Sequence, residues 1–161
     1  ARQNQIPLLA LNISSEIHNK VYAEGLDNLN LEERPKVPKN MQVPSEHYQQ
    51  RLQTIFDAHP KDSSFENFVD GQVLWDEFMG NTAAVYLKDN PDKRMIILTG
   101  IGHLLYGDGI PQVLSQRLMP GQSSIIINGD QFGDALGIAH FRLIAPEVET
   151  LPNPGRIGVI L

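Results

Sequence analysis

Residues 95–111 read MIILTGIGHLLYGDGIP, and this stretch decides which fold we predict for the chain. It opens with an apolar run as long as a buried strand and continues as a glycine-dense loop with one histidine, one tyrosine and one aspartate. Glycine lets the backbone turn sharply and approach a ligand closely. In α/β proteins, ligands bind beyond the carboxyl ends of such strands, so the stretch predicts a buried strand followed by a functional loop.

Outward from this stretch, predicted strands and helices alternate along the chain. Short apolar runs predict further strands, beside the one at 95–99, at residues 6–11, 124–128 and 139–145. Capping residues and helical spacing predict helices at 14–24, 28–33, 45–59, 65–88 and 110–118. Strands separated by helices imply an α/β fold with a mostly parallel sheet that is covered by helices.

The composition is that of an ordinary globular domain and excludes several kinds of function. The chain has 161 residues, 41% of them hydrophobic and 20% charged, which is enough for one domain with a real core. The formal net charge of -6 argues against non-specific nucleic acid binding. The absence of cysteine excludes disulfides and thiolate chemistry, and no apolar run is long enough to span a membrane.

Three side chains of the glycine-dense loop are candidates for chemistry. His103 can bind a metal, move a proton or hold a carboxylate, and Gly102 beside it would let a ligand approach the backbone. Tyr106 can ligate ferric iron as a phenolate; alternatively its ring packs and its hydroxyl binds a carbonyl. Asp108 fits a turn next to glycine.

The helix predicted at 65–88 is apolar nearly all round, which is typical of a buried helix. Gln72, Trp75, Asp76 and Met79 share one face of it. A buried polar side chain without a partner costs about 1–3 kcal/mol, so Gln72 and Asp76 each need one. That partner is either structural, such as the His103 loop, or a ligand or water in a pocket. His18 and His47 are expected on exposed helix faces.

The chain resembles a known family in several matched segments. The pattern of residues 100–111 looks like the C-terminal signature of the ChaN-like haem-binding lipoproteins. QVLWDEFM at 72–79 is similar to the helix that precedes this signature, and ALNI at 10–13 with GLDNL at 25–29 looks like the family's middle section. These matches extend over most of residues 6–150.

The resemblance implies an erythromycin-esterase/Tiki-like fold of which only the second half is present. It makes residues 1–150 the C-terminal part of the haem-binding domain. Residues 151–161 would be a linker and the first strand of a following PDZ-like domain. Because half a domain leaves sheet edges and apolar helix faces uncovered, we expect the fragment to need its upstream half or a partner chain.

The resemblance also implies haem as cofactor and a role in bacterial iron uptake. Family members are anchored through an N-terminal lipid on the periplasmic side of the cell envelope and enclose haem in a homodimer. Tyr106 is then the expected iron ligand, with Tyr86 second, and His103 holds a propionate or lines the site. The wall of the haem site would be formed by Leu104, Leu105, Ile110, Trp75 and Met79. Beside the haem would lie Gln72, Asp76 and Gly102.

Two other functions stay open. The domain is distantly similar to erythromycin esterases and Tiki-type proteases, which implies a metal-dependent hydrolase with His103 as base or metal ligand and Asp76 as its aid. The other is an interaction module in which the glycine loop is a structural turn. The resemblance favours a binding protein over an enzyme.

Overall fold

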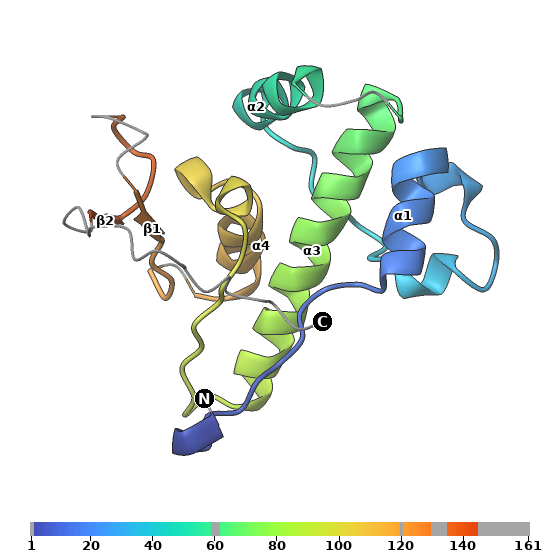
Figure 1. Ribbon diagram of the computed structural model, residues 1–161. Coiled ribbons are helices and arrows are strands. Elements are labelled where there is room, and N and C mark those ends of the chain that lie inside the picture. Colours follow the sequence, from blue (N-terminus) through green and yellow to red (C-terminus); the bar gives the residue numbers. More distant parts are fainter. Residues whose placement is uncertain (1, 59–61, 120, 130–134, 145–161) are drawn as a thin grey trace, which may run out of the picture.

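The computed structural model describes residues 2–58, 62–119, 121–129 and 135–144 (Figure 1). Within these ranges the chain forms the helices α1 (Ser15–Glu24), α2 (Glu46–Asp57), α3 (Phe65–Asp89) and α4 (Ile110–Arg117). The strands are β1 (Ile126–Asn128) and β2 (Phe141–Leu143). Single turns of 3₁₀ helix lie at Arg2–Asn4, Leu26–Asn28, Arg34–Lys36, Ile101–His103 and Leu105–Gly107.

The long helix α3 is the centre of the fold, as its apolar circumference predicts. In Figure 1 it runs diagonally through the molecule, with α1 on one side, α4 on the other and α2 near its first residues. Two of the predicted N-caps are confirmed: the Ser45 hydroxyl accepts from the Tyr48 N–H at 3.1 Å, and the Ser64 hydroxyl accepts from the Asn67 N–H at 3.1 Å. Each cap satisfies one of the N–H groups that a helix start leaves free. Ser14 precedes α1, but its side chain makes no capping hydrogen bond.

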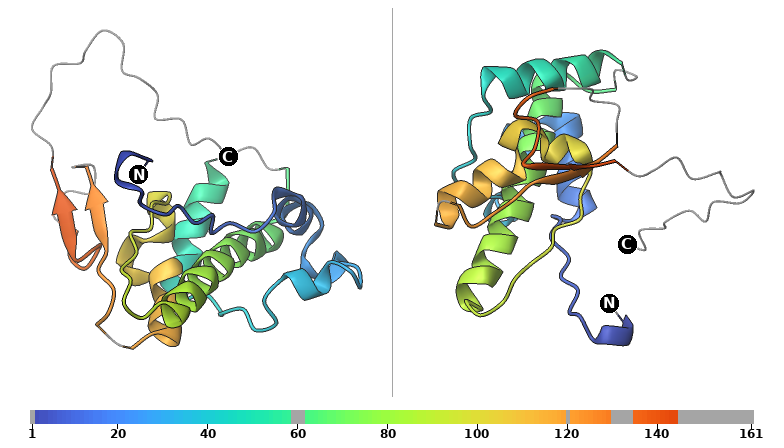
Figure 2. Two further views of the ribbon diagram at one scale, coloured as in Figure 1. Left: turned by 90° about the horizontal axis from the view of Figure 1, so that it is seen from below. Right: turned by 90° about the vertical axis from the view of Figure 1, so that its left-hand side faces the viewer.

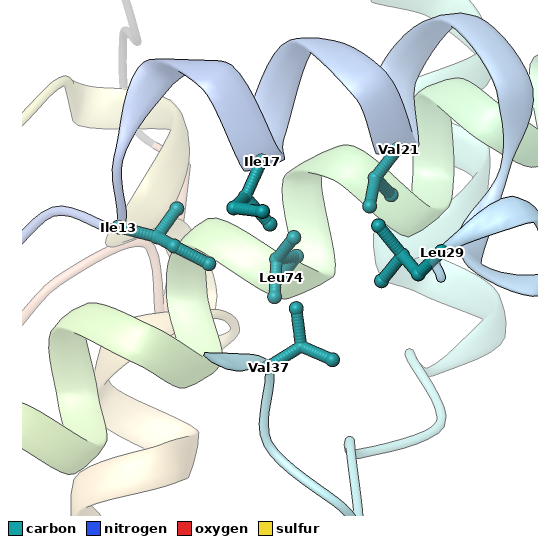
Figure 3. Packing of buried hydrophobic residues seen from close by; sticks show 6 residues of the cluster. All are labelled: Ile13, Ile17, Val21, Leu29, Val37 and Leu74. Carbon is teal, nitrogen blue, oxygen red and sulfur yellow. The ribbon is translucent and has the colours of Figure 1, made fainter. Parts of the chain in front are cut away.

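An aliphatic cluster joins α1 to α3. Figure 3 shows Leu74 of α3 between Ile17 of α1 and Val37 of the segment before α2. Leu74 is fully buried and Ile17 is 2% exposed. Burial of an aliphatic side chain contributes roughly 1.5–3 kcal/mol, so a few such contacts fix α1 on this face of α3.

Helix α4 packs very closely against another face of α3. A Cβ atom on Gly80 would lie 2.5 Å from the Val113 Cγ1 atom, so glycine is what allows this approach. Ile110 and Val113 of α4 are buried against α3, and Pro111 occupies the first turn of α4 as predicted.

Helix α2 covers the first turns of α3 with an aromatic and aliphatic face. Tyr48, Leu52 and Phe56 are buried there, and the Phe56 ring lies 5.4 Å from that of Phe68 between centroids. Helical spacing in the sequence predicts Ile55 on the same face as these three residues, but it is 40% exposed, because it lies at the edge of the contact with α3.

A two-stranded parallel sheet lies on the side of α4 that faces away from α3 (Figure 2). Ile126 pairs with Phe141 and Asn128 with Leu143. The buried residues Ile125, Ile127 and Ile138 join this sheet to the glycine-dense loop through Ile101, Leu104 and Leu105. Both strands fall within predicted ranges; residue 145, the end of the second range, lies outside the described residues.

Two predicted strands and one predicted helix are wrong. Residues 6–11 and 95–99 are extended, but no described strand pairs with them, so they are not strands. Along 95–99 half-buried and exposed side chains still alternate, with Ile96 88% and Leu98 91% exposed. The predicted helix at 28–33 is not formed, and single 3₁₀ turns lie before and after this segment. Within it, the Asn30 side-chain oxygen accepts hydrogen bonds from the N–H groups of Glu32 and Glu33, which stabilises a local turn instead of a helix.

The described residues therefore form a mixed helix and sheet structure, which fits the predicted class at a coarse level. The broad helix-covered sheet is not present in the described part of the chain, where the sheet has only β1 and β2. Residues 151–161, predicted as the entry into a PDZ-like domain, lie outside the described residues.

Candidate functional site

The glycine-dense loop after residue 99 consists of two consecutive 3₁₀ turns tied to the sheet. The Tyr106 N–H donates to the Ile138 carbonyl at 2.9 Å, which fixes the second turn beside β2. Tyr106 adopts φ 61°, a left-handed conformation that a bulky side chain rarely takes. Such backbone conformations persist where surrounding contacts impose them, and they cluster at functional sites.

A buried carboxylate holds the histidine of this loop. Asp76 of α3 is fully buried, and its Oδ1 lies 2.7 Å from Nδ1 of His103. Its Oδ2 accepts a hydrogen bond from the Tyr48 hydroxyl of α2 at 2.6 Å. Burial and the neighbouring Asp76 charge raise the pKa of the Tyr48 hydroxyl, so Tyr48 stays protonated and donates. The structural partner expected for Asp76 is therefore the His103 loop, as one alternative predicted.

Gly109 makes room for this carboxylate. A Cβ atom at this position would lie 2.7 Å from the His103 carbonyl oxygen and 2.9 Å from Asp76 Oδ1. The residue also has φ 66° and ψ -129°, which side-chain-bearing residues strongly disfavour. Glycine at 109 is thus required by both the backbone and the contact between loop and helix.

Trp75 links His103 to a second histidine. The rings of Trp75 and His18 stack at 3.6 Å between centroids, and Trp75 meets His103 edge-on at 5.9 Å. His18 is only 5% exposed, so its prediction as a surface residue is wrong. The helical pattern placed it on the polar side of α1, but Trp75 lies directly beneath it. His47, also predicted at the surface, is exposed.

The burial of His18 makes a pH dependence of stability testable. Burial lowers the pKa of His18 from its ordinary value of 6.5, so the unfolded chain takes up a proton that the folded chain refuses. The contribution of the neutral His18 to the free energy of unfolding is therefore present above pH 6.5 and is lost as the pH falls below that value. We expect urea unfolding at pH 7.5 and 5.5 to differ less in His18→Phe than in wild type. Equal differences would show that His18 does not carry the effect.

Tyr106 lies against α2, where its ring meets the ring of His47 and the guanidinium of Arg51. The Arg51 guanidinium stands 5.0 Å from the Tyr106 ring centroid and 5.2 Å from that of Tyr48. Arg51 also pairs with Asp108 and donates to the Leu105 carbonyl at 3.3 Å. Asp108, interpreted from the sequence as a turn former, thus fastens the loop to α2. The Tyr106 side chain remains 41% exposed.

The other predicted site residues are spread over different surroundings. Met79 and Ile110 are core residues between α3 and α4, with 6% and 1% exposure, and this burial does not favour their expected place in a ligand wall. Gln72 is half-buried and has no hydrogen bond to another described residue, so its required partner is not found there. Tyr86 is half-buried toward the end of α3.

A second buried polar group, which the sequence did not reveal, lies on a different face of α3. Glu77 is 1% exposed and pairs with Arg117 of α4 at 2.6 Å, while its other oxygen accepts from the Gln42 N–H at 2.9 Å. Arg117 also borders an open hollow of about 420 Å³, together with Phe78, Asn81 and the segment 35–40. His103 and Tyr106, which were expected together at the haem site, do not line this hollow.

Within the described ranges, no three histidine, aspartate or glutamate side chains gather as a metal site would require. None of the helices described there combines the length and apolar character needed to cross a membrane. The loop presents a histidine imidazole from its first 3₁₀ turn and a tyrosine phenol from its second.

These residues can be set against known proteins. A family model described as haem-binding uptake, Tiki superfamily, ChaN matches residues 1–114. The chain belongs to this family. The match includes α3 and the whole glycine-dense loop, so the resemblance predicted from the sequence is confirmed. No curated protein and no solved structure matches the chain.

Membership of a haem-binding uptake family gives the loop a chemical context. Haem iron takes axial ligands from imidazole or phenolate groups, and His103 and Tyr106 are of these two types. His103 in particular has the hydrogen-bonded carboxylate that accompanies metal-binding histidines in proteins. The residues of the loop therefore fit the donor chemistry of a haem site.

Proposed function

We propose that the protein binds haem during bacterial iron uptake, at the surface formed by the loop at 100–109. The observation that carries this proposal is the 2.7 Å contact between His103 and the fully buried Asp76, in a chain of a haem-binding family. When bound, haem supplies the iron that the uptake route carries. His103 and Tyr106 are the residues that would hold it, and Trp75 supports His103 from behind.

The test is a hemin titration into the purified chain, followed by visible absorbance. Wild type is expected to give a saturable change of the Soret band, and a His103→Ala/Tyr106→Phe double variant is expected to lose most of it, because both donors are gone. A Tyr86→Phe variant is the control and is expected to bind like wild type. Absence of saturable binding by wild type would refute the proposal.

We further propose that the protein works as a homodimer on the periplasmic side of the bacterial cell envelope, as a lipid-anchored member of its family. Support for self-association comes from the apolar side chains that extended segments leave exposed. They include Leu8 at 85%, Ile96 at 88% and Leu98 at 91%. Exposed apolar surface of this kind marks association sites, and unpaired extended backbone favours pairing with another chain.

For this dimer we expect an Ile96→Lys/Leu98→Lys variant to dissociate at least tenfold more readily than wild type, equivalent to about 1.4 kcal/mol. Two charges would be buried where two apolar side chains had been. Leu31→Lys is the matched control, because Leu31 is 94% exposed but lies apart from these segments. Light scattering across a dilution series measures the change. A wild-type chain that stays monomeric at all concentrations would contradict the proposal.

A second candidate function is metal-dependent hydrolysis, and the contact between Asp76 and His103 is again what favours it. A carboxylate that orients an imidazole is the arrangement of a general base. Turnover of a chromogenic ester or peptide that disappears in His103→Ala, with a stoichiometric metal in the purified protein, would support it. No turnover in a preparation that binds hemin would decide for haem binding alone.

A further inference from the structure

The hollow that Arg117 borders is a candidate site of its own. Its volume of about 420 Å³ falls within the range of small-molecule sites in proteins. Residues 35–40 line it together with Phe78 and Asn81 of α3 and Arg117 of α4. No residue of the glycine-dense loop belongs to its lining. A ligand in this hollow would therefore not share its contacts with the loop.

Residues 35–40, with the sequence PKVPKN, are fastened to α3 at two points. The Val37 side chain is 7% exposed and packs in the aliphatic cluster with Leu74 (Figure 3). Just after the segment, the Gln42 N–H donates to the Glu77 carboxylate at 2.9 Å. The two prolines of the segment restrict its φ angles. Because this wall is already ordered, little conformational freedom is lost when a ligand binds against it.

The lining of the hollow is cationic although the chain as a whole is acidic. Lys36, Lys39 and Arg117 line it, and none of the described lining residues is an aspartate or a glutamate. The formal net charge of the chain, in contrast, is -6. Neither lysine forms an ion pair within the described ranges. Lys36 acts electrostatically on Glu33, but that carboxylate already pairs with Lys20 at 2.7 Å. The hollow thus offers two positive charges without a counterion.

Arg117 adds N–H groups that are held in place. A guanidinium carries five N–H donors. Arg117 uses three of them, donating to the Glu77 carboxylate at 2.6 Å, the Asn81 side chain at 3.2 Å and the Val113 carbonyl at 3.2 Å. Two N–H groups remain without an acceptor among the described residues. Arginine binds carboxylate and phosphate oxygens through such groups, so Arg117 supplies both charge and direction.

Apolar groups lie beside these charges. Phe78 and the two prolines of segment 35–40 line the same hollow. A small inorganic ion would leave this apolar surface in contact with water, whereas an organic ligand buries its hydrocarbon part against it. We propose that the hollow binds a small organic anion, whose carboxylate or phosphate group pairs with the three cationic side chains and whose apolar part packs on Phe78. This inference goes beyond the haem binding proposed for the loop and does not depend on it.

The experiment is an NMR titration of the isotope-labelled full chain with phenyl phosphate and with benzoate. We expect saturable shifts of the amide signals of residues 36–40 and of the Asn81 side chain. The anion that binds more tightly identifies the preferred acidic group. Benzyl alcohol, a neutral molecule with the same ring, is expected to give no saturable shift.

Variants test the role of the two lysines. Lys36→Gln/Lys39→Gln is expected to bind the preferred anion about tenfold more weakly at low ionic strength, because two charge contacts are lost. Lys88→Gln/Lys93→Gln is the matched control and is expected to bind like wild type. It removes the same charge at two exposed lysines that do not line the hollow.

Three results would overturn the inference. They are the absence of saturable shifts with both anions, equal binding of benzyl alcohol, and unchanged affinity in Lys36→Gln/Lys39→Gln. Hemin added to the phenyl phosphate complex gives a further test. Retention of phenyl phosphate would support a separate site, and its displacement by one equivalent of hemin would make the hollow part of the haem site and overturn the inference. Failure of wild type to bind hemin would refute the proposed function and leave the anion site standing.

Discussion

Gly109→Ala is expected to destabilise the protein by at least about 2 kcal/mol, which for a chain of this size lowers the melting temperature by roughly 5 °C. One part of this cost is the backbone, which holds φ 66° and ψ -129° at this residue. The other is the contact of the new Cβ atom with the His103 carbonyl and the Asp76 carboxylate. Because the carbonyl belongs to the backbone, the contact is relieved only if the whole loop moves.

The loop supplies a matched control for this variant. Gly102 lies in the same segment, does not have a left-handed φ, and has open space where its Cβ would be. Gly102→Ala is therefore expected to change stability by less than about 0.5 kcal/mol. Thermal and urea melts of the two variants check the pair. Equal stability of Gly109→Ala and Gly102→Ala would mean that Asp76 does not meet the loop as described.

The helices of this fold are predictable from the sequence because their signals are local. Ser45 and Ser64 cap α2 and α3 as predicted, and the apolar circumference of α3 predicts its central place. The predictions of strands at 6–11 and 95–99 were wrong because strand formation does not depend on local signals alone. A strand exists only where another strand pairs with it, and an apolar run alone does not say whether that neighbour is present.

The site was predictable in part. The glycine-dense loop drew attention to His103, and the burial of α3 required a partner for Asp76, which the structure identifies as this histidine. Tyr48 was missed because helical spacing assigned it to the apolar face of α2. It does lie on that face, and only its hydroxyl reaches the carboxylate. The polar end of a buried tyrosine always needs a partner, and that requirement was the unused signal.

The pair formed by Glu77 and Arg117 was not predicted, because no loop motif drew attention to Arg117 as the glycine-dense loop did to His103. Glu77 stands next to Asp76, so helical spacing gives the two carboxylates different faces of the same buried helix. Each face therefore needs its own polar partner from another element: a histidine and a tyrosine for Asp76, an arginine for Glu77.

Arg117→Met is expected to cost about 3–5 kcal/mol of stability, because it leaves the Glu77 charge buried without its counterion. Arg117 also donates to the Asn81 side chain of α3 at 3.2 Å, so its bonds to two α3 side chains are lost at once, together with its bond to the Val113 carbonyl within α4 at 3.2 Å. Adding Glu77→Gln to this variant should restore part of the loss. The amide is neutral and still accepts from the Gln42 N–H, which donates to Glu77 in the wild type.

Arg34→Met is the control, since Arg34 forms an exposed pair with Asp27 at 3.4 Å and such pairs contribute little. Urea unfolding of all four proteins, wild type included, measures the differences. If Arg117→Met were no less stable than Arg34→Met, the charge of Glu77 would not be buried against α4. If the double variant were no more stable than Arg117→Met, the cost would lie in lost packing of the arginine side chain rather than in an uncompensated charge.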